Sequence, residues 1–387
     1  MRIVYAAAVC SETAYAELFR NSDSIPSFQA QKYNRLFAEG LSAHTRVDLV
    51  GYPPIEPEAV PGMSVRLPDE TANGVRYHYL RAFRGRFFRR LWILLASFFQ
   101  CLRLLDSESV LITDCLNQMS ALGGILAARL KGCRCVGIVT DLPEFIGFGA
   151  AGRKLFDVSK ALCTDYIFLT EAMNARLNSS GKPHVVLEGH ADIAMREKQP
   201  DIGRKAVPRI VLYAGSIHEI YGISRLVEGF RKAALPDTRL VVYGSGDYVD
   251  RLREISRADP SVFYGGLLLP SQVVEEEMSA VLLVNPRPSD AEFVKYSFPS
   301  KTMEYMSTGT PLLTTDLPGL PEEYRPHVFL IKDETPDGIA RALRETLARS
   351  DEELFAFGCE AREFILRERN NEVQAGKVLA MLTEDRG

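Results

Sequence analysis

The sequence predicts an α/β protein with two Rossmann-like, doubly wound domains that face a cleft. Its 387 residues are too many for one ordinary hydrophobic core and suit two domains of about 180 to 200 residues each. Short apolar runs alternate with stretches of helical spacing, which is typical of a parallel sheet covered on both faces. The alternation pauses at a polar stretch, residues 195–207, and then restarts.

In the first half, apolar runs predict strands at residues 2–8, 45–52, 109–114, 133–141, 164–170 and 184–189. Helical spacing predicts helices at residues 29–41, 89–105 and 120–132. Because helices separate most of these short strands, the strands are expected to run parallel. We assign residues 1–200 to an N-terminal domain.

The second half repeats this pattern, with strands predicted at residues 209–215, 239–246, 262–266, 280–286, 311–316 and 328–331. Helices are predicted at residues 223–234, 250–257, 270–278 and 300–307. We assign residues 207–370 to a C-terminal domain. Residues 371–387 have an apolar stripe, so we expect this last helix to fold back onto the first domain; the stripe is Val373, Val378, Leu379 and Leu382.

Composition describes an ordinary globular chain with a net charge of -4, which gives no argument for a nucleic-acid partner. The seven cysteines are odd in number and form no pair of CxxC motifs, so we expect reduced, buried thiols in a cytoplasmic protein. The chain opens directly into an apolar strand and not into a signal-peptide pattern. The longest apolar run, residues 91–99, is shorter than the roughly 20 residues of a membrane-spanning helix.

The strongest local signal is the segment 296–318, YSFPSKTMEYMSTGTPLLTTDLP. Pro299 suits the first turn of a helix, which places Ser300 and Thr302 near the helix N-terminus. A helix N-terminus presents unpaired N–H groups and a partial positive charge, and Lys301 adds a full charge. The segment therefore predicts a binding site for an anion such as a diphosphate.

Glu304 follows one turn later, where its carboxylate can accept two hydrogen bonds from the vicinal hydroxyls of a ribose. The alternative is a capped amphipathic helix with Met303 and Met306 in the core and no ligand. Helix caps are far commoner than phosphate sites, so the segment alone leaves both interpretations open.

Glycines follow three predicted strands of the second half, in YAGSIHEIYGI (213–223), YGSGDY (243–248) and YGGL (264–267). Glycine lets a diphosphate approach the backbone closely, as at Gly215 beside Ser216. A strand-to-helix turn also favours glycine for structural reasons alone. The coincidence of three such turns at strand ends favours a nucleotide site.

These residues resemble the GT-B glycosyltransferases of the large retaining family that includes sucrose synthase and bacterial mannosyltransferases. The resemblance rests on the order YAGS, LVEGF, VVYGSG, VFYGGL, VNP and FPSKTMEYMSTGTPLLTTDLPGLPE, and covers the second half well and the first in outline. It implies that a UDP- or GDP-sugar binds to the second domain and that the first domain binds a glycan or lipid-linked acceptor. Glu304 matches the later glutamate of a paired-glutamate motif, which holds the ribose.

By this resemblance the turn at Gly215 and Ser216 approaches the phosphates, and Phe298 to Thr302 lie near the diphosphate and base. The donor-binding residues expected are Gly215, Ser216, His218, Tyr243, Gly244, Leu267, Phe298, Pro299, Ser300, Lys301, Thr302 and Glu304.

Three positions depart from the family's pattern. The earlier glutamate of the pair would stand at position 296, where this chain has Tyr296. Many members carry an arginine and a lysine where this chain has Ser216 and Tyr221. We therefore expect Lys301 to neutralise the leaving diphosphate, with His218 as a weaker substitute.

The catalytic residues expected are Lys301, Asp114 and Asp141. The two aspartates end predicted strands of the first half and would orient the acceptor or the donor sugar. The alternative is that they cap the helices that follow. The resemblance implies retention at the anomeric carbon, and the absence of a DxD pair predicts a reaction without metal; no cofactor is expected beyond the donor itself.

Residues 81–105 combine arginines with aromatic residues and the only tryptophan. This composition suits a peripheral contact with anionic lipid at the inner face of the cell membrane. The alternative is an ordinary helix with Leu91, Leu94 and Phe98 packed on the sheet and its arginines in solvent.

Three other functions compete with a transferase of bacterial polysaccharide or glycolipid biosynthesis. A nucleotide-sugar epimerase would use the same pocket but needs several carboxylates around the sugar. A dinucleotide-dependent oxidoreductase would need GxGxxG after the first strand, and RIVYAAAVCSETA has none. A non-catalytic partner of another transferase would explain Ser216 and Tyr221.

Overall fold

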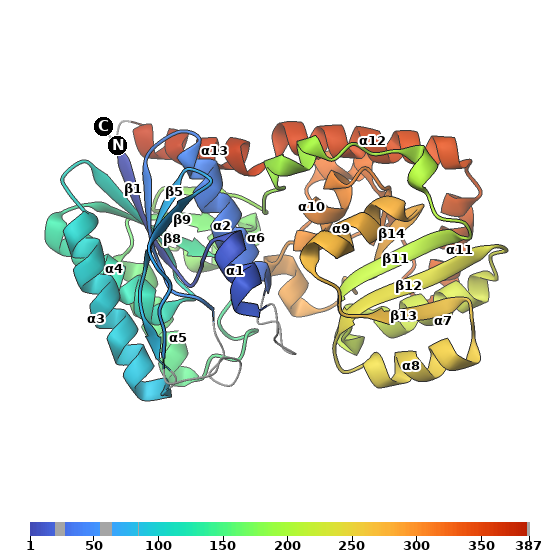
Figure 1. Cartoon of the computed structure of the whole chain (residues 1–387), viewed down its shortest axis with the longest axis horizontal. Helices are drawn as coiled ribbons and strands as arrows, with labels where there is room; N and C mark the ends of the chain where they lie inside the picture. Colours follow the sequence, from blue (N-terminus) through green and yellow to red (C-terminus); the bar gives the residue numbers. More distant parts are fainter. Residues whose placement is uncertain (20–27, 55–63, 84, 385–387) are drawn as a thin grey trace. The chain divides into compact units, whose positions relative to one another are not determined.

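The computed structural model describes residues 1–19, 28–54, 64–83 and 85–384, which form two compact units (Figure 1). The first unit contains Met1–His190 and Asn371–Gly387, and the second contains Ala191–Asn370. The boundary therefore lies ten residues before the predicted end of the first domain. The polar stretch that we predicted as a linker belongs to the second unit, where it contributes the short 3-10 helices η1 (Ile193–Glu197) and η2 (Ile202–Arg204).

The first unit is built on a sheet whose strands, in the described part of the chain, follow the order β10-β9-β8-β7-β1-β2-β5-β4. Neighbouring strands run parallel except for β4 and β5. The strands are β1 (Arg2–Ala7), β2 (Val47–Gly51), β4 (Glu70–Ala72), β5 (Val75–Tyr79), β7 (Ser109–Asp114), β8 (Arg134–Val139), β9 (Asp165–Phe168) and β10 (His184–Val186). A separate pair joins β3 (Ser64–Val65) to β6 (Ala82–Phe83).

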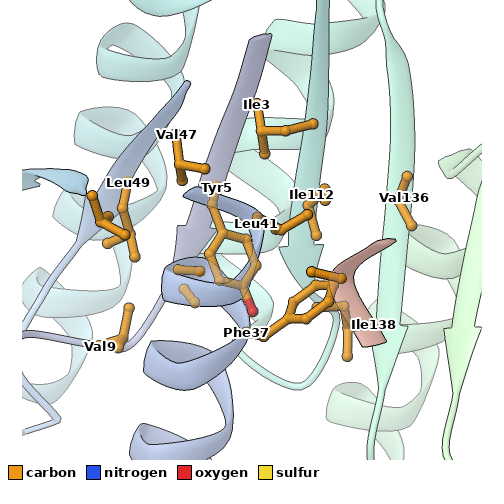
Figure 2. Close-up of a cluster of buried hydrophobic side chains, with 14 of the residues drawn as sticks. Ile3, Tyr5, Val9, Phe37, Leu41, Val47, Leu49, Ile112, Val136 and Ile138 are labelled. Carbon is orange, nitrogen blue, oxygen red and sulfur yellow. The ribbon is translucent and has the colours of Figure 1, made fainter. Parts of the chain in front are cut away.

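The core of this unit lies between the sheet and two helices, α2 (Phe28–Ser42) and α13 (Asn371–Thr383) (Figure 2). The rings of Tyr5 and Phe37 meet edge to face at 6.1 Å in this core. The C-terminal helix contributes Val378 and Leu382 to it, as their spacing predicted. The prediction that Val373 belongs to the buried stripe was wrong. This side chain is 36% exposed, because other residues form the buried face of α13.

The remaining helices of the first unit are α1 (Glu12–Phe19), α3 (Arg86–Leu104), α4 (Gln118–Lys131), α5 (Ala150–Leu162) and α6 (Glu171–Leu177). Helix α3 buries Ile93, Ser97 and Cys101. It packs closely against α4, since a Cβ added to Gly123 would lie 2.4 Å from the carbonyl oxygen of Leu94. Leu91, which the alternative interpretation packed on the sheet, is 48% exposed, because contact with α4 sets which face of α3 is covered.

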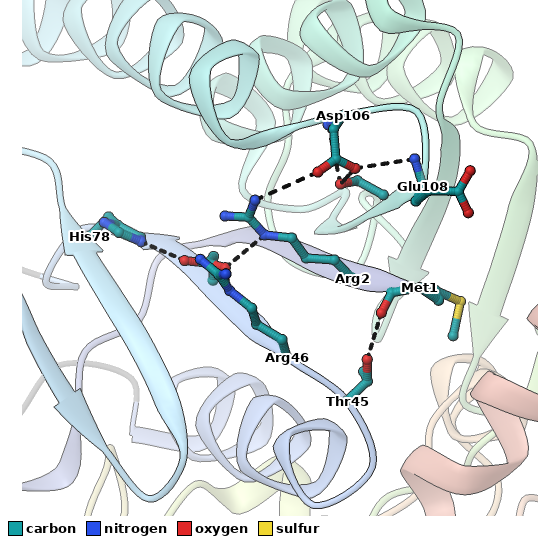
Figure 3. A network of polar contacts seen from close by, with 9 residues as sticks. Met1, Arg2, Thr45, Arg46, His78, Asp106 and Glu108 are labelled. Atoms are coloured by element: carbon teal, nitrogen blue, oxygen red, sulfur yellow. Dashed lines mark hydrogen bonds and ion pairs between the residues drawn. The ribbon is translucent and has the colours of Figure 1, made fainter.

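A network of charged side chains connects the neighbouring strands β1, β2 and β5 (Figure 3). The carboxylate of Asp48, only 1% exposed, accepts hydrogen bonds from Arg2 Nε at 2.8 Å and Arg46 Nε at 2.9 Å. His78 Nε2 lies 3.0 Å from its other oxygen. Burial alone would raise the pKa of Asp48, but the hydrogen bonds with His78, Arg2 and Arg46 outweigh burial and lower it below 3.8.

Replacing Asp48 with asparagine is expected to lower the free energy of unfolding by about 1–3 kcal/mol at pH 7, because a buried charged acceptor is lost. A carboxyl whose pKa is lower in the folded than in the unfolded chain stabilises the fold above its unfolded pKa, and this stabilisation disappears as the pH falls through the folded pKa. Denaturant unfolding of both chains from pH 7 downwards should show the difference shrinking below about pH 4. A difference that does not change with pH would contradict this account.

The second unit contains a fully parallel sheet with the strand order β13-β12-β11-β14-β15-β16 in the described residues. Its strands are β11 (Arg209–Ser216), β12 (Thr238–Ser245), β13 (Val262–Gly266), β14 (Leu282–Asn285), β15 (Leu312–Thr315) and β16 (Phe329–Ile331). Numbered from the first strand, this is the order 3-2-1-4-5-6 of a dinucleotide-binding fold. The order reverses between β11 and β14, and ligands of such sheets bind beyond the carboxyl ends of the strands at this switch point.

Helices α7 (Ile223–Ala233), α8 (Val249–Ala258), α9 (Pro270–Ser279), α10 (Ser300–Ser307), α11 (Pro336–Leu347) and α12 (Asp351–Glu368) surround this sheet (Figure 1). Helix α11 was not predicted from the sequence. Its Ile339, Ala340 and Leu343 belong to the core beneath α7. The alternation that predicted two doubly wound units is confirmed by both sheets.

Candidate functional site

The turn after β11 lies at the switch point of the second unit and ends with Gly222 at the start of α7. Gly215 has φ of 145° and Gly222 has φ of 80°, both in the region that favours glycine. A Cβ at Gly222 would lie 2.2 Å from the carbonyl oxygen of Pro286, which follows β14. The turn after β11 therefore lies directly against the residue that follows β14.

Lys301, in the first turn of α10, extends onto this turn. A Cβ at Gly215 would lie 1.7 Å from Lys301 Nζ, so the space that a larger residue would fill is occupied by the ammonium group. Lys301 Nζ donates a hydrogen bond to Tyr213 Oη at 3.1 Å, and Tyr213 Oη donates to the carbonyl of Ser216 at 2.7 Å. The structure thus brings together three of the predicted residues: Gly215, Ser216 and Lys301.

Tyr305, which is not among the residues predicted from the sequence, fixes α10 to the same strand. Its Oη accepts a hydrogen bond from Ala214 N at 2.9 Å and donates to Ala214 O at 3.0 Å. Burial raises the pKa of Tyr305 well above its ordinary value, so the phenol keeps its proton. Tyr305 stands four residues after Lys301, on the same face of α10. This spacing was the only sequence signal for its role.

Helix α10 begins at Ser300, so Pro299 lies just before the helix and not in its first turn. Its inner face is packed in the core, as the alternative interpretation predicted, and contains Thr302, Met303, Tyr305 and Met306. Phe298 is also buried and lies 5.5 Å from the ring of Tyr324. Ser300 is exposed, whereas Lys301 and Glu304 are partly exposed. Of the predicted residues on α10, these three are therefore the ones a ligand can reach.

The end of β12 packs against the end of β11. A Cβ at Gly244, whose φ is 134°, would lie 1.7 Å from the carbonyl oxygen of Gly215. Burial, with the nearby Glu276, raises the pKa of Tyr243 to about 12. Leu267, beyond β13, is 53% exposed and available to an apolar ligand surface.

His218 occupies the middle of the turn and has an acidic partner. Its Nδ1 lies 3.1 Å from Asp247 Oδ2, and hydrogen bonding with His218 is the main cause that lowers the pKa of Asp247. Because Asp247 already occupies a ring nitrogen of His218, Lys301 is the stronger candidate for binding an anion.

The two predicted aspartates lie at the ends of neighbouring strands of the first unit: Asp114 is the last residue of β7, and Asp141 follows β8. Asp114 is buried, and its carboxylate accepts hydrogen bonds from Leu116 N at 2.9 Å, Asn34 Nδ2 at 3.2 Å and Asn117 Nδ2. Burial raises the pKa of Asp114, and this effect outweighs the hydrogen bonds, which lower it. These contacts fix the turn before α4, whose N-cap residue is Asn117, so the capping role that the sequence left open for Asp114 is wrong. Asp141 is partly exposed beyond β8.

Comparison with known proteins assigns the second unit to a family. Residues 208–349 match the family model described as "Glycosyl transferases group 1". No curated protein matches the chain. Similar solved structures include sucrose-phosphate synthase from Thermosynechococcus elongatus, with 16% identity, a TM-score of 0.69 and 99% of each chain covered. The HepE protein of Anabaena, in complex with UDP, has 12% identity, a TM-score of 0.63 and 100% of each chain covered.

Trehalose 6-phosphate synthase from Burkholderia multivorans has 12% identity and a TM-score of 0.63, with 98% of this chain and 96% of that chain covered. These likenesses extend over both units, and the family match covers the unit that carries the glycine turns and Lys301. Residues 208–349 thus form a glycosyl transferases group 1 domain, and the whole chain has the two-domain GT-B fold of these structures.

Proposed function

We propose that this enzyme transfers a sugar from a UDP- or GDP-sugar to a glycan or lipid-linked acceptor in bacterial polysaccharide or glycolipid biosynthesis. The observation that carries the proposal is the ammonium group of Lys301 seated on Gly215, at the switch point of a glycosyl transferases group 1 domain. UDP is the first donor nucleotide to test, because structures of HepE contain UDP, and in one case UDP and glucose.

The diphosphate, the ribose and the base of the donor can each be matched to a group in the second unit. Lys301 and the turn at Gly215 suit the diphosphate, because a backbone without side chains admits the phosphates and the ammonium group balances their charge. The partly exposed carboxylate of Glu304 suits two ribose hydroxyls. The exposed side chain of Leu267 suits the flat face of a base.

In the proposed reaction the acceptor hydroxyl attacks the anomeric carbon from the side on which the diphosphate leaves. The bond from that carbon to the phosphate oxygen breaks, and its electron pair goes to the nucleoside diphosphate. The acceptor's proton passes to the departing phosphate oxygen, so the sugar retains its configuration and no separate protein base is needed. Lys301 stabilises the charge that develops on the diphosphate, and neither a metal nor a further cofactor takes part.

A nucleotide panel and a turnover assay test this proposal. UDP, GDP, ADP and CMP, with their common sugar conjugates, are added to the full chain, and thermal unfolding is measured. A ligand at 100 times its dissociation constant should add about 2.7 kcal/mol of stability. Binding with release of the nucleotide from its sugar conjugate supports the transferase, whereas a folded chain that binds none of these compounds refutes it.

A non-catalytic partner of another transferase is the second candidate, because Ser216 and Tyr221 place no positive charge in the turn after β11. Binding of a nucleotide sugar without release of the nucleotide, in the presence of glycan and lipid-linked acceptors, would favour this candidate.

An apolar face on α3 and α4 leads us to propose that the enzyme binds anionic lipid. The exposed side chains on α3 recur at helical spacing and are 37% to 62% exposed: Phe88, Leu91, Trp92, Leu95 and Phe99. Leu126 and Leu130 on α4 are also exposed. Neither helix contains Asp or Glu, and both carry basic residues, including Arg90 and Lys131. No helix in the described residues is long and apolar enough to span a bilayer.

The double substitution Leu95→Glu and Phe99→Glu is expected to reduce sedimentation with phosphatidylglycerol-containing vesicles at least tenfold. Each change removes an apolar contact and adds a negative charge that anionic lipid repels. Ile202→Glu, at another exposed apolar position, is the matched control and should bind as wild type does. Equal binding of wild type to neutral and anionic vesicles, or none to either, would contradict the proposed lipid contact.

A further inference from the structure

Arg287 lies on the other side of the switch point from Lys301. It follows β14, whose residues Leu282 and Leu283 pair with Val211 and Leu212 of β11. The contact of Gly222 with the carbonyl of Pro286 shows that this segment lies directly against the turn after β11.

Contacts with two aromatic rings and a hydrogen bond to a serine position the guanidinium of Arg287. Its Cζ lies 5.6 Å from the centre of the Tyr221 ring and 4.7 Å from that of Phe293. Its Nη2 donates a hydrogen bond to Ser297 Oγ at 3.0 Å. Arg287 is partly exposed. It therefore connects the turn after β11 with the segment that leads into α10.

The charge of the turn itself does not suit a diphosphate. Residues 215–222 contain no Lys or Arg, Glu219 is acidic, and His218 is paired with Asp247. Positive charge must come from neighbouring elements. Lys301 supplies it at the Gly215 end of the turn, and Arg287 lies beside Tyr221 at the Gly222 end.

We propose that Arg287 binds the diphosphate of the nucleotide-sugar donor together with Lys301. A guanidinium offers parallel N–H donors that match two phosphate oxygens, and it stays charged at every pH at which the enzyme folds. Stacking on Tyr221 and Phe293 limits the side-chain entropy that is lost on binding. This inference rests on the proposed transferase function and adds a residue that contacts the donor.

The test compares UDP with uridine, and GDP with guanosine, as ligands of wild type, Arg287→Gln, Arg287→Lys and Arg251→Gln. Arg251 is the matched control, because it is exposed on α8 and paired with Glu254 three residues away. Affinity for the diphosphates is measured by titration and that for the nucleosides by competition. Arg287→Gln is expected to weaken diphosphate binding about 10- to 100-fold and to leave nucleoside binding unchanged.

Arg287→Lys keeps the charge and is expected to recover part of this loss, whereas Arg251→Gln should bind as wild type does. An equal loss of diphosphate and nucleoside affinity in Arg287→Gln would show a structural role and overturn the inference, as would unchanged diphosphate binding. If wild type binds no nucleoside diphosphate, the proposed function fails and this inference fails with it. If wild type binds one and Arg287→Gln binds it equally well, only this inference fails.

Discussion

Replacing Lys301 with methionine is expected to lower kcat by roughly 10²–10³-fold, the usual cost of removing one group that stabilises charge in a transition state. Methionine has a similar length and keeps the apolar part of the side chain, so the loss reports on the ammonium group, whose nitrogen lies 4.3 Å from the centre of the Tyr213 ring. Initial rates of nucleotide release at saturating donor measure the effect. A variant that retains wild-type kcat would show that Lys301 does not act on the leaving diphosphate.

Gly215→Ala provides a second route to the same loss. The added methyl group would take the position of Lys301 Nζ, and the φ of 145° disfavours any residue with a Cβ. Because the atom displaced is the end of a flexible side chain, we expect kcat to fall as in Lys301→Met while the chain still folds. Near-ultraviolet circular dichroism verifies the folding. Wild-type turnover in this variant would contradict the importance of the contact.

Glu304→Ala is expected to weaken donor binding by roughly 3 kcal/mol, or a hundredfold or more in Kd. Two hydrogen bonds from ribose hydroxyls to a charged acceptor are lost, and each contributes about 1.5–3 kcal/mol. A donor concentration of 100 times the wild-type Kd adds about 2.7 kcal/mol to wild type, but would add only about 0.4 kcal/mol to a variant weakened a hundredfold. The shift in melting temperature with ligand should therefore almost disappear.

The matched control is Glu363→Ala, on the exposed face of α12, where the carboxylate pairs with Arg367 four residues away. Its ligand-induced shift should equal that of wild type. Both variants should melt close to wild type without ligand, since Glu304 is partly exposed and lies outside the packed face of α10. A full ligand-induced shift in Glu304→Ala would place the ribose elsewhere.

The sequence by itself determined the fold class, because apolar periodicity reports which residues a strand or helix must bury. It also located the turn at Gly215 and the segment that contains Lys301, since glycine at a strand end and proline before a helix are local requirements of the backbone. These features depend on neighbours in the chain. The buried face of α10 could be read from the sequence for the same reason, as Met303 and Met306 show.

Only the tertiary structure decided which of these segments meet. The ammonium group of Lys301 fills the space at Gly215 because α10 packs against β11, a strand far away in the sequence, and Tyr305 fixes that packing. Arg287 reaches the same turn because β14 pairs with β11, and no local pattern encodes the order of parallel strands. The exposed face of α3 was likewise set by its contact with α4, so periodicity alone misassigned Leu91. Contacts between distant segments depend on how complete elements pack, and this information is spread over the whole chain.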